Sequence, residues 1–179
     1  MRVDIIKKTA FAVAAFVLFF WVFALVTSPK KQIFYYADTT LQKSGFSISQ
    51  DDIADYWLFC VVKEFGFSNG SGPLLKSKKA LLLPLGIVNV IKLTDTNADG
   101  QWKGLVPWVA NDTYILHSVF EPTKIRIFSF GDFGKANATI GLSKKNINLI
   151  VYPTDEAKQK IPMNIFKEEN GGLRYETVF

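Results

Sequence analysis

Two residue types that nucleophilic catalysis commonly uses occur once each in this sequence, as Cys60 and His117. A Cys–His pair could generate a reactive thiolate, but only if the fold brings the two side chains together, and neither residue lies in a recognisable catalytic motif. Cys60 stands in the apolar run 57–62, where a cysteine usually behaves as a small buried hydrophobe. His117 lies in an alternating segment and is expected at the surface or in a structural hydrogen bond. We assign no catalytic residue and predict that the chain is not an enzyme.

A second candidate for chemistry is the segment 95–100, DTNADG, which matches the first half of a calcium-binding loop. Calcium takes six to eight oxygen ligands, and such a loop closes with a bidentate glutamate at its twelfth position. Here that position is Val106, and Lys103 brings a positive charge into the loop. Because the flanking residues favour strands rather than helices, we interpret the segment as a solvated turn. We predict no metal site and no cofactor.

The other charged residues form no binding motif. Asp51–Asp52 and Glu168–Glu169 are paired carboxylates in turn-like segments, where charge is normally just solvated. Lys76, Lys78 and Lys79 are the nearest approach to a basic patch, in a chain of net charge +5. Beyond the first residues only Arg126 and Arg174 could offer bidentate contacts to phosphate, so nucleic acid is not an expected partner.

The N-terminal segment predicts a membrane location. Residues 9–26 contain no charged side chain, and a transmembrane helix needs about 20 mostly apolar residues. The alternative is a cleaved secretory signal, which shares the basic start and the apolar core. This apolar run is longer than a typical signal core, and no small-x-small cleavage site precedes Pro29. An uncleaved signal anchor over residues 9–27 is the interpretation that we favour.

The basic residues on either side of this segment suggest its orientation. Arg2, Lys7 and Lys8 precede it, and Lys30 and Lys31 follow it, which by the positive-inside rule favours a cytoplasmic N-terminus. We therefore expect a single-pass protein of a bacterial inner membrane. The predicted organisation is a cytoplasmic segment 1–8, the anchor 9–27, a juxtamembrane linker with a short helix 28–45, and a periplasmic β-rich domain 46–179.

The exported part predicts one short helix followed by strands. Residues 31–44 show helical spacing, with Ile33, Tyr36 and Leu41 on one apolar face, which we expect to pack on the domain. From Phe46 onward the hydrophobic period changes to two, as is typical of strands. The fold class is therefore mainly β within an α+β chain. A length of 179 residues and a hydrophobic content of 49% agree with one folded domain plus the anchor.

The clearest strands form a hairpin over residues 136–142 and 147–151, where apolar and polar residues alternate. One face is predicted to be buried and the other to be in water. The expected buried residues are Ile140, Leu142, Ile147, Leu149 and Val151, and the expected solvent-facing residues are Thr139, Lys144 and Asn148.

The order of these features resembles a known layout. A span with basic flanks leads into a short helix and the strand start Gly45–Phe46, and Gly131-Asp-Phe-Gly134 leads into the hairpin. This resembles small accessory proteins of bacterial envelope machines, in particular the protein N family of type II secretion and AsmA-like modules. Periplasmic accessory proteins of flagellar motors have the same layout. The resemblance implies an inner-membrane anchor joined to a curved antiparallel β-sheet.

Three functions follow as hypotheses. The first is a non-enzymatic structural protein that is tethered in the membrane and docks on a larger envelope assembly, either a secretion system or a flagellar motor. Its partners would be other protein subunits, and exposed sheet edges would offer docking sites. The second is a lipid-binding or lipid-transport module, with the apolar segment 81–90 lining the sheet. An enzyme is the third hypothesis, and it lacks candidate residues.

Overall fold

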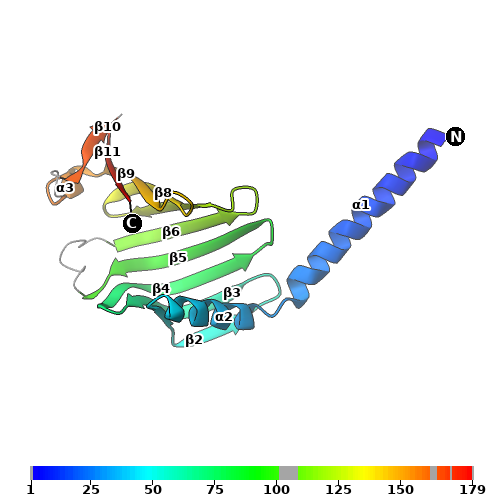
Figure 1. The fold of residues 1–179 in the computed structure, drawn as a ribbon, viewed down its shortest axis with the longest axis horizontal. Helices are drawn as coiled ribbons and strands as arrows, with labels where there is room; N and C mark the ends of the chain where they lie inside the picture. The colour runs from blue at the N-terminus through cyan, green and yellow to red at the C-terminus, as the bar shows by residue number, and fades with distance from the viewer. Residues whose placement is uncertain (1, 101–108, 162–164, 170, 179) are drawn as a thin grey trace.

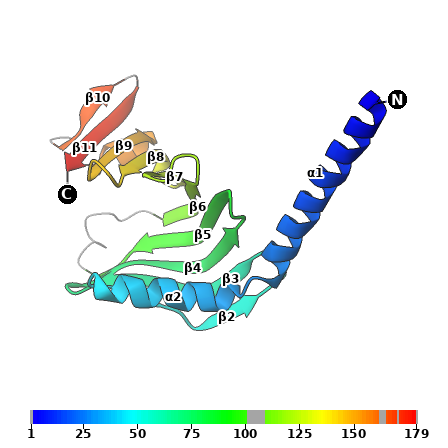
Figure 2. The ribbon, with the colours of Figure 1, turned by 45° about the vertical axis from the view of Figure 1, so that its right-hand side comes forward.

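The computed structural model describes residues 2–100, 109–161, 165–169 and 171–178. It consists of a long N-terminal helix, a second helix that lies on a sheet, and one open sheet of 11 strands (Figure 1). The sheet curves along its length, so that the last strands lie at an angle to β3–β6 (Figure 2). The predicted fold class, a mainly antiparallel β-sheet behind an apolar helix, is confirmed.

Helix α1, Arg2–Thr27, contains neither glycine nor proline and ends just before Pro29. Its segment Ile5–Thr27 is apolar and 23 residues long, which at 1.5 Å per residue gives about 35 Å. A bilayer core is about 30 Å thick, so this helix is long enough to cross it. The first part of the chain is thus one apolar helix of membrane-spanning length.

Helix α2, Lys30–Lys43, packs on the start of the sheet, as predicted, but through a different face. Lys30 and Phe34 are buried, whereas Ile33 and Tyr36 are exposed. The face predicted from apolar spacing was therefore wrong. The packed face carries Phe34, and on the same side the Asp38 carboxylate accepts a hydrogen bond of 2.9 Å from the Ile48 backbone N–H of β1.

The sheet is antiparallel throughout. Its strands pair in the order β1-β3-β4-β5-β6-β7-β8-β9-β11-β10, and β2 pairs with β3 beside β1. The bounds of the strands are β1 Phe46–Ser49, β2 Asp52–Asp55, β3 Cys60–Asn69, β4 Gly72–Pro84, β5 Val88–Ala98, β6 Val109–Ser118, β7 Lys124–Gly131, β8 Gly134–Gly141, β9 Asn146–Pro153, β10 Lys167–Glu169 and β11 Gly172–Val178. A short helix α3, Asp155–Lys158, follows β9.

The two faces of the sheet differ in chemistry. Residues paired across neighbouring strands project to the same side, so the register defines each face. We call one side the apolar face, because one row across eight strands consists of Cys60, Leu82, Ile91, Ile115, Ile127, Ala138, Leu149 and Tyr175. The adjacent row on the opposite side is mixed and consists of Val61, Leu81, Lys92, Tyr114, Phe128, Asn137, Ile150 and Arg174.

Two small cores stabilise the ends of the apolar face. Under α2, Phe34 packs into a cluster with Ile53, Cys60, Val62, Ala80 and Leu93. At the other end, Val151, Ile161 and Leu173 form a second cluster beside α3. Thr154 fixes this helix, since its Oγ1 accepts from the Ala157 N–H as an N-cap and donates to the Asp132 carbonyl.

The predicted hairpin is present as β8 and β9, and its register is confirmed. Ile140 pairs with Ile147 on the apolar face, and Thr139 pairs with Asn148 on the other. The expected burial was only partly right: Val151 is buried, whereas Ile140, Ile147 and Leu149 are half-buried, and so is Thr139 on the other face. Leu142 follows β8 in the turn and is 45% exposed. Asn148 is half-buried and donates a 2.9 Å hydrogen bond to Glu176, because β11 pairs along β9.

Candidate functional site

The structure does not bring Cys60 and His117 together. Cys60 begins β3 and His117 lies in β6, so two strands separate them, a distance of about 14 Å at the usual strand spacing. Cys60 is only 1% exposed, and burial, with Asp55 nearby, raises the pKa of its thiol. His117 Nε2 lies 3.1 Å from the Pro122 carbonyl oxygen, a structural hydrogen bond. No Cys–His chemistry follows from this arrangement.

The segment resembling a calcium loop has a structural role. Asp95 adopts a left-handed φ of 52° inside β5, and Thr94 and Thr96 on either side of it pair with β4. The Asp99 carboxylate accepts from the Gly100 N–H at 2.7 Å. Lys103 and Val106 lie outside the described residues. Within the described part of the chain, no group of three His, Cys, Asp or Glu side chains could hold a metal ion.

The other charged candidates are separated, and some of them form ion pairs. Asp52 pairs with Lys63 at 3.3 Å, and Lys76 pairs with Glu64 at 3.0 Å. This hydrogen bond to Glu64 raises the pKa of Lys76. These are exposed pairs between neighbouring strands of the sheet, and they do not converge on one site.

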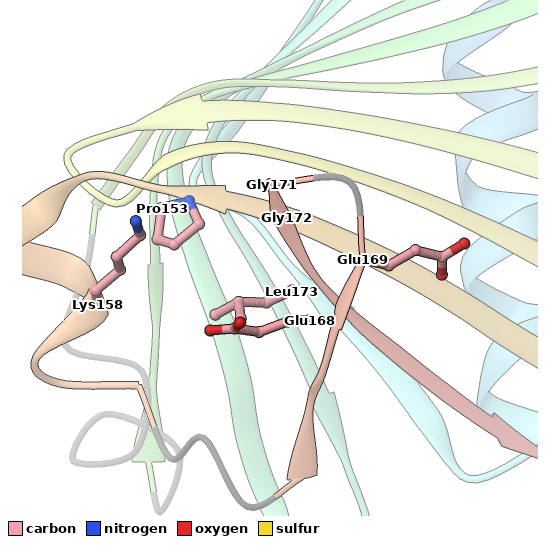
Figure 3. A pocket seen from close by; sticks show the side chains of 7 residues that line it. All are labelled: Pro153, Lys158, Glu168, Glu169, Gly171, Gly172 and Leu173. Atoms are coloured by element: carbon pink, nitrogen blue, oxygen red, sulfur yellow. The ribbon is translucent and has the colours of Figure 1, made fainter.

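A cavity of about 320 Å³ lies near the C-terminal end of the sheet (Figure 3). It is lined by Pro153, Lys158, Glu168, Glu169, Gly171, Gly172 and Leu173. Glu169 points out of it and pairs with Arg174 at 2.8 Å. Lys158 and Glu168 alone do not make a set of converging groups, so we assign no reaction to this cavity.

A different feature distinguishes the end of the sheet beside α1. Because the strands alternate in direction, four connections lie at this end: residues 56–59, 85–87, 119–123 and 142–145. We call them the anchor-end rim. Each carries at least one exposed large apolar side chain, and the exposed set is Tyr56, Trp57, Leu58, Ile87, Val119, Phe120 and Leu142. At the opposite end, the β3–β4 turn is polar, with Gly70 and Ser71.

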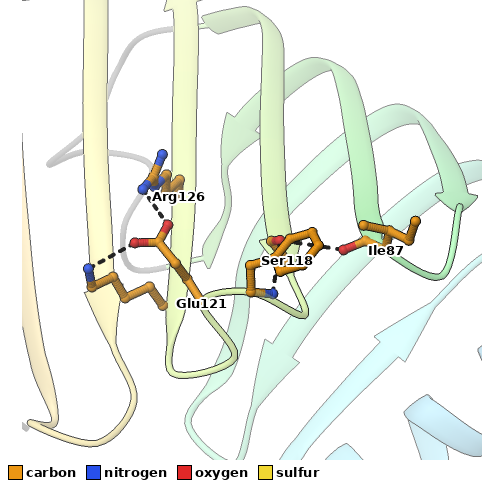
Figure 4. A network of polar contacts seen from close by, with 6 residues as sticks. Ile87, Ser118, Glu121 and Arg126 are labelled. Carbon is orange, nitrogen blue, oxygen red and sulfur yellow. Dashed lines mark hydrogen bonds and ion pairs between the residues drawn. The ribbon is translucent and has the colours of Figure 1, made fainter.

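The rim connections are joined to one another by hydrogen bonds. The Val119 N–H donates to the Ile87 carbonyl at 3.1 Å, and the Leu142 N–H donates to the Thr123 carbonyl at 2.8 Å. Ser118 Oγ accepts from the Phe120 N–H and donates to the Ile87 carbonyl (Figure 4). Three of the four turns are therefore held in a row, with Phe120 at the tip of its turn.

Ion pairs support the same turn. The Glu121 carboxylate pairs with Lys124 at 3.0 Å and also with Arg126 (Figure 4). The Lys124 hydrogen bond, with the nearby charge of Arg126, lowers the pKa of Glu121. The one acidic side chain within residues 119–123 is thus neutralised by basic neighbours.

One turn of the rim contacts α1. A Cβ added at Gly86 would stand 3.6 Å from Trp21 Nε1, so the β4–β5 turn and this part of α1 are neighbours. Trp21 and Leu25, four residues apart on one face of α1, are half-buried, whereas most of the helix is exposed. The linker to α2 is only Ser28 and Pro29, which keeps the sheet next to the end of the apolar helix.

The centre of the apolar face is open. Helix α2 packs mainly against β1 and β2, and α3 against β9, and in the described part of the chain helices make at most weak contacts with β6, β7 and β8. On β6, Ile115 still reaches the cluster that contains Phe34. The row nearest the rim is polar on β5 and β6, with Asn89 and His117, and apolar on β7–β9, with Ile125, Ile140 and Ile147. The apolar face therefore runs from the rim across strands that helices leave uncovered.

The sheet edges are poor sites for strand addition. At one edge, β2 spans only Asp52–Asp55 and has an aspartate at each end, while β1 has four uncharged residues, of which Ile48 donates its N–H to Asp38 of α2. At the other edge, β10 spans only Lys167–Glu169, all exposed and charged. Short charged edges are a common way to prevent edge-to-edge pairing. The rim and the open face were not singled out from the sequence, although apolar residues such as Trp57 and Phe120 inside expected turns were a usable signal.

A scan against protein-family models finds no match, and searches of curated proteins and of solved structures find no similar chain either.

Proposed function

We propose that this protein is a non-enzymatic, membrane-tethered module that holds the acyl chains of lipid against the open apolar face of its sheet. The observation that carries the proposal is the unbroken apolar row across β5–β9, which includes Ile91, Ile115 and Ile127. These side chains are already half-buried, so each gains only part of the about 1.5–3 kcal/mol that full transfer of an Ile side chain from water contributes. Several such residues together favour a flexible apolar ligand.

The position of this face supports lipid over other apolar ligands. The face begins at the rim, and the rim lies beside Trp21 in the apolar helix. An acyl chain that leaves a bilayer spanned by α1 would therefore meet Ile125, Ile140 and Ile147 first and the row through Ile127 next. The short linker allows this transfer without a long excursion of the domain.

A partner protein is the second candidate, and one observation favours it. The chain already packs helices on this face at both ends, through Phe34 in the first cluster and Ala157 in α3. The backbones of the three strands β6–β8 span about 10 Å, which is close to the diameter of one helix of a partner. In this form the protein would be an accessory subunit of a larger envelope assembly, such as a secretion system or a flagellar motor.

We further propose that α1 spans a bacterial inner membrane, with residues 1–8 in the cytoplasm and 28–179 in the periplasm. The basic residues before the apolar segment support this orientation. A periplasm-dependent reporter fused after the last residue should be active. Activity only from a cytoplasm-dependent reporter would show the opposite orientation. A mature chain that begins near residue 29 would show that the N-terminal helix is a cleaved signal and not an anchor.

Site-specific photo-crosslinking in whole membranes separates the two candidates. A diazirine amino acid at Ile127 lies on the apolar face, and the same group at Phe128 lies one residue away on the opposite face. A lipid adduct at residue 127 that is absent at 128 supports lipid binding. A discrete protein adduct at 127 identifies the docking function instead. Equal labelling at the two positions, or none at either, would refute both uses of the face.

A further inference from the structure

The geometry points to a second membrane contact: we propose that the anchor-end rim inserts its exposed apolar side chains into the headgroup layer of the bilayer that α1 spans. The partner is a lipid surface. This inference rests on the proposed membrane span but not on lipid binding by the apolar face. The sheet would then stand on the membrane through two attachments, the helix and the rim.

The first argument is the distribution of exposed apolar residues. Trp57 and Phe120 are each 80% exposed, and they stand at the tips of two separate connections of the rim. Tryptophan is enriched at membrane–water interfaces, where its amphipathic ring is favoured. A group of exposed aromatic and aliphatic residues at one end of a domain marks an interaction surface. At the opposite end of the sheet, the β3–β4 turn of Gly70 and Ser71 carries no apolar side chain, and Phe130 and Tyr152 near that end are only about half as exposed as Trp57 and Phe120.

The second argument is depth. Trp21 lies six residues before the end of α1 at Thr27, which corresponds to about 9 Å along the helix axis. The β4–β5 turn contacts the helix at this level. Amphipathic elements at a bilayer surface bury their apolar side about 5–10 Å into the boundary between headgroups and acyl chains. The helix contact therefore places Ile87, and the neighbouring turns bonded to it, at the depth of that boundary.

The third argument is pre-organisation. The Ile87–Val119 and Thr123–Leu142 backbone hydrogen bonds fix three turns in a row. Ordering a flexible loop on binding costs conformational entropy, and a rim that is already ordered avoids most of that cost. The hydrogen bonds thus hold Phe120 and Leu142 outward in water, at an end of the sheet where a lipid surface would cover them.

The charge of the residues around the rim also favours a lipid surface as the partner. Lys144 and Lys145 lie in the β8–β9 connection, and Lys124 and Arg126 flank the Phe120 turn. Glu121, the acidic residue among them, is already paired. Basic side chains near a membrane surface are attracted to anionic headgroups. The rim therefore combines apolar tips with basic flanks, the composition of peripheral membrane-binding elements.

The test is depth-dependent fluorescence quenching on the full chain in vesicles of phosphatidylcholine and phosphatidylglycerol. The environment-sensitive dye NBD is attached to a single cysteine in a Cys60→Ser background, at Phe120→Cys, Ser71→Cys or Phe16→Cys. Nitroxide lipids carry the quencher either near the headgroup or near the bilayer centre. Residue 71 is the control at the far end of the sheet, and residue 16 reports on insertion of α1.

The expected result is a blue-shifted emission at residue 120 that is quenched more by the shallow nitroxide, with the opposite order at residue 16 and no quenching at residue 71. Quenching at 16 without quenching at 120 would overturn the rim inference and leave the span intact. Absence of quenching at both 16 and 120 would overturn both. Equal quenching at 120 and 71 would mean that the domain lies flat on the membrane, which also contradicts the proposal.

Discussion

Replacing Phe34 by alanine tests how the first part of the chain is held together. Phe34 is 3% exposed and packs from α2 into the cluster formed with Ile53, Cys60 and Val62. Truncating a buried phenylalanine removes its transfer free energy and leaves a cavity, at a cost of about 3–5 kcal/mol. Single domains unfold with a total of about 5–15 kcal/mol, so Phe34→Ala should remove a large fraction of the stability.

The matched control lies on the same helix. Tyr36 is 77% exposed, so Tyr36→Ala should change the free energy of unfolding by no more than about 0.5 kcal/mol. Guanidinium unfolding of the full chain in detergent micelles, followed by near-UV circular dichroism, gives both values. An equal decrease in the free energy of unfolding for the two variants, or a decrease below about 1 kcal/mol for Phe34→Ala, would refute the packing of α2 through Phe34.

Three further outcomes are expected. Gly134→Ala should lower the melting temperature strongly, because φ is +108° and an added Cβ would stand 2.2 Å from the Tyr152 carbonyl oxygen; Gly70→Ala, with open space around it, should leave the temperature unchanged. Cys60 should react with iodoacetamide only after unfolding, and rapid alkylation of the folded chain would contradict its burial. Because the pKa of its thiol is raised in the folded chain, the free energy of unfolding should fall as pH rises past the ordinary pKa of a thiol. The pKa of Glu121 is lowered in the folded chain, so the small stabilisation by its ion pairs is present above the ordinary pKa of a glutamate and is lost as pH falls through the folded value. In an acid titration of the melting temperature, this part of the decrease should be absent from Glu121→Gln.

The elements that local pattern determines were predictable from the sequence. The run of apolar residues without glycine or proline defines α1, and strict alternation defines the β8–β9 register. Elements that depend on distant neighbours were not. The buried face of α2 depends on contacts with the sheet, through Phe34 in the first cluster and the Asp38–Ile48 hydrogen bond. The environment of Asn148 follows from the pairing of β11 with β9.

The rim could not be assembled from the sequence for the same reason. Its connections are up to about 90 residues apart in the chain, and only the antiparallel order of the strands brings them to one end. Each connection alone has one to three exposed large apolar residues, and small groups of this kind are ordinary on a protein surface. These residues form one surface only because the four connections lie at the same end of the sheet, where the β4–β5 turn contacts Trp21.

The central claim is that the open apolar face binds lipid, and native mass spectrometry of the full chain released from detergent micelles tests it most directly. The wild-type chain should carry bound lipid, Ile127→Asp on the apolar face should lose it, and Phe128→Asp on the opposite face should keep it, with the folding of each variant checked by circular dichroism. A wild-type mass without lipid, or equal lipid in all three chains, would contradict the claim, because lipid bound only around α1 would not depend on residue 127.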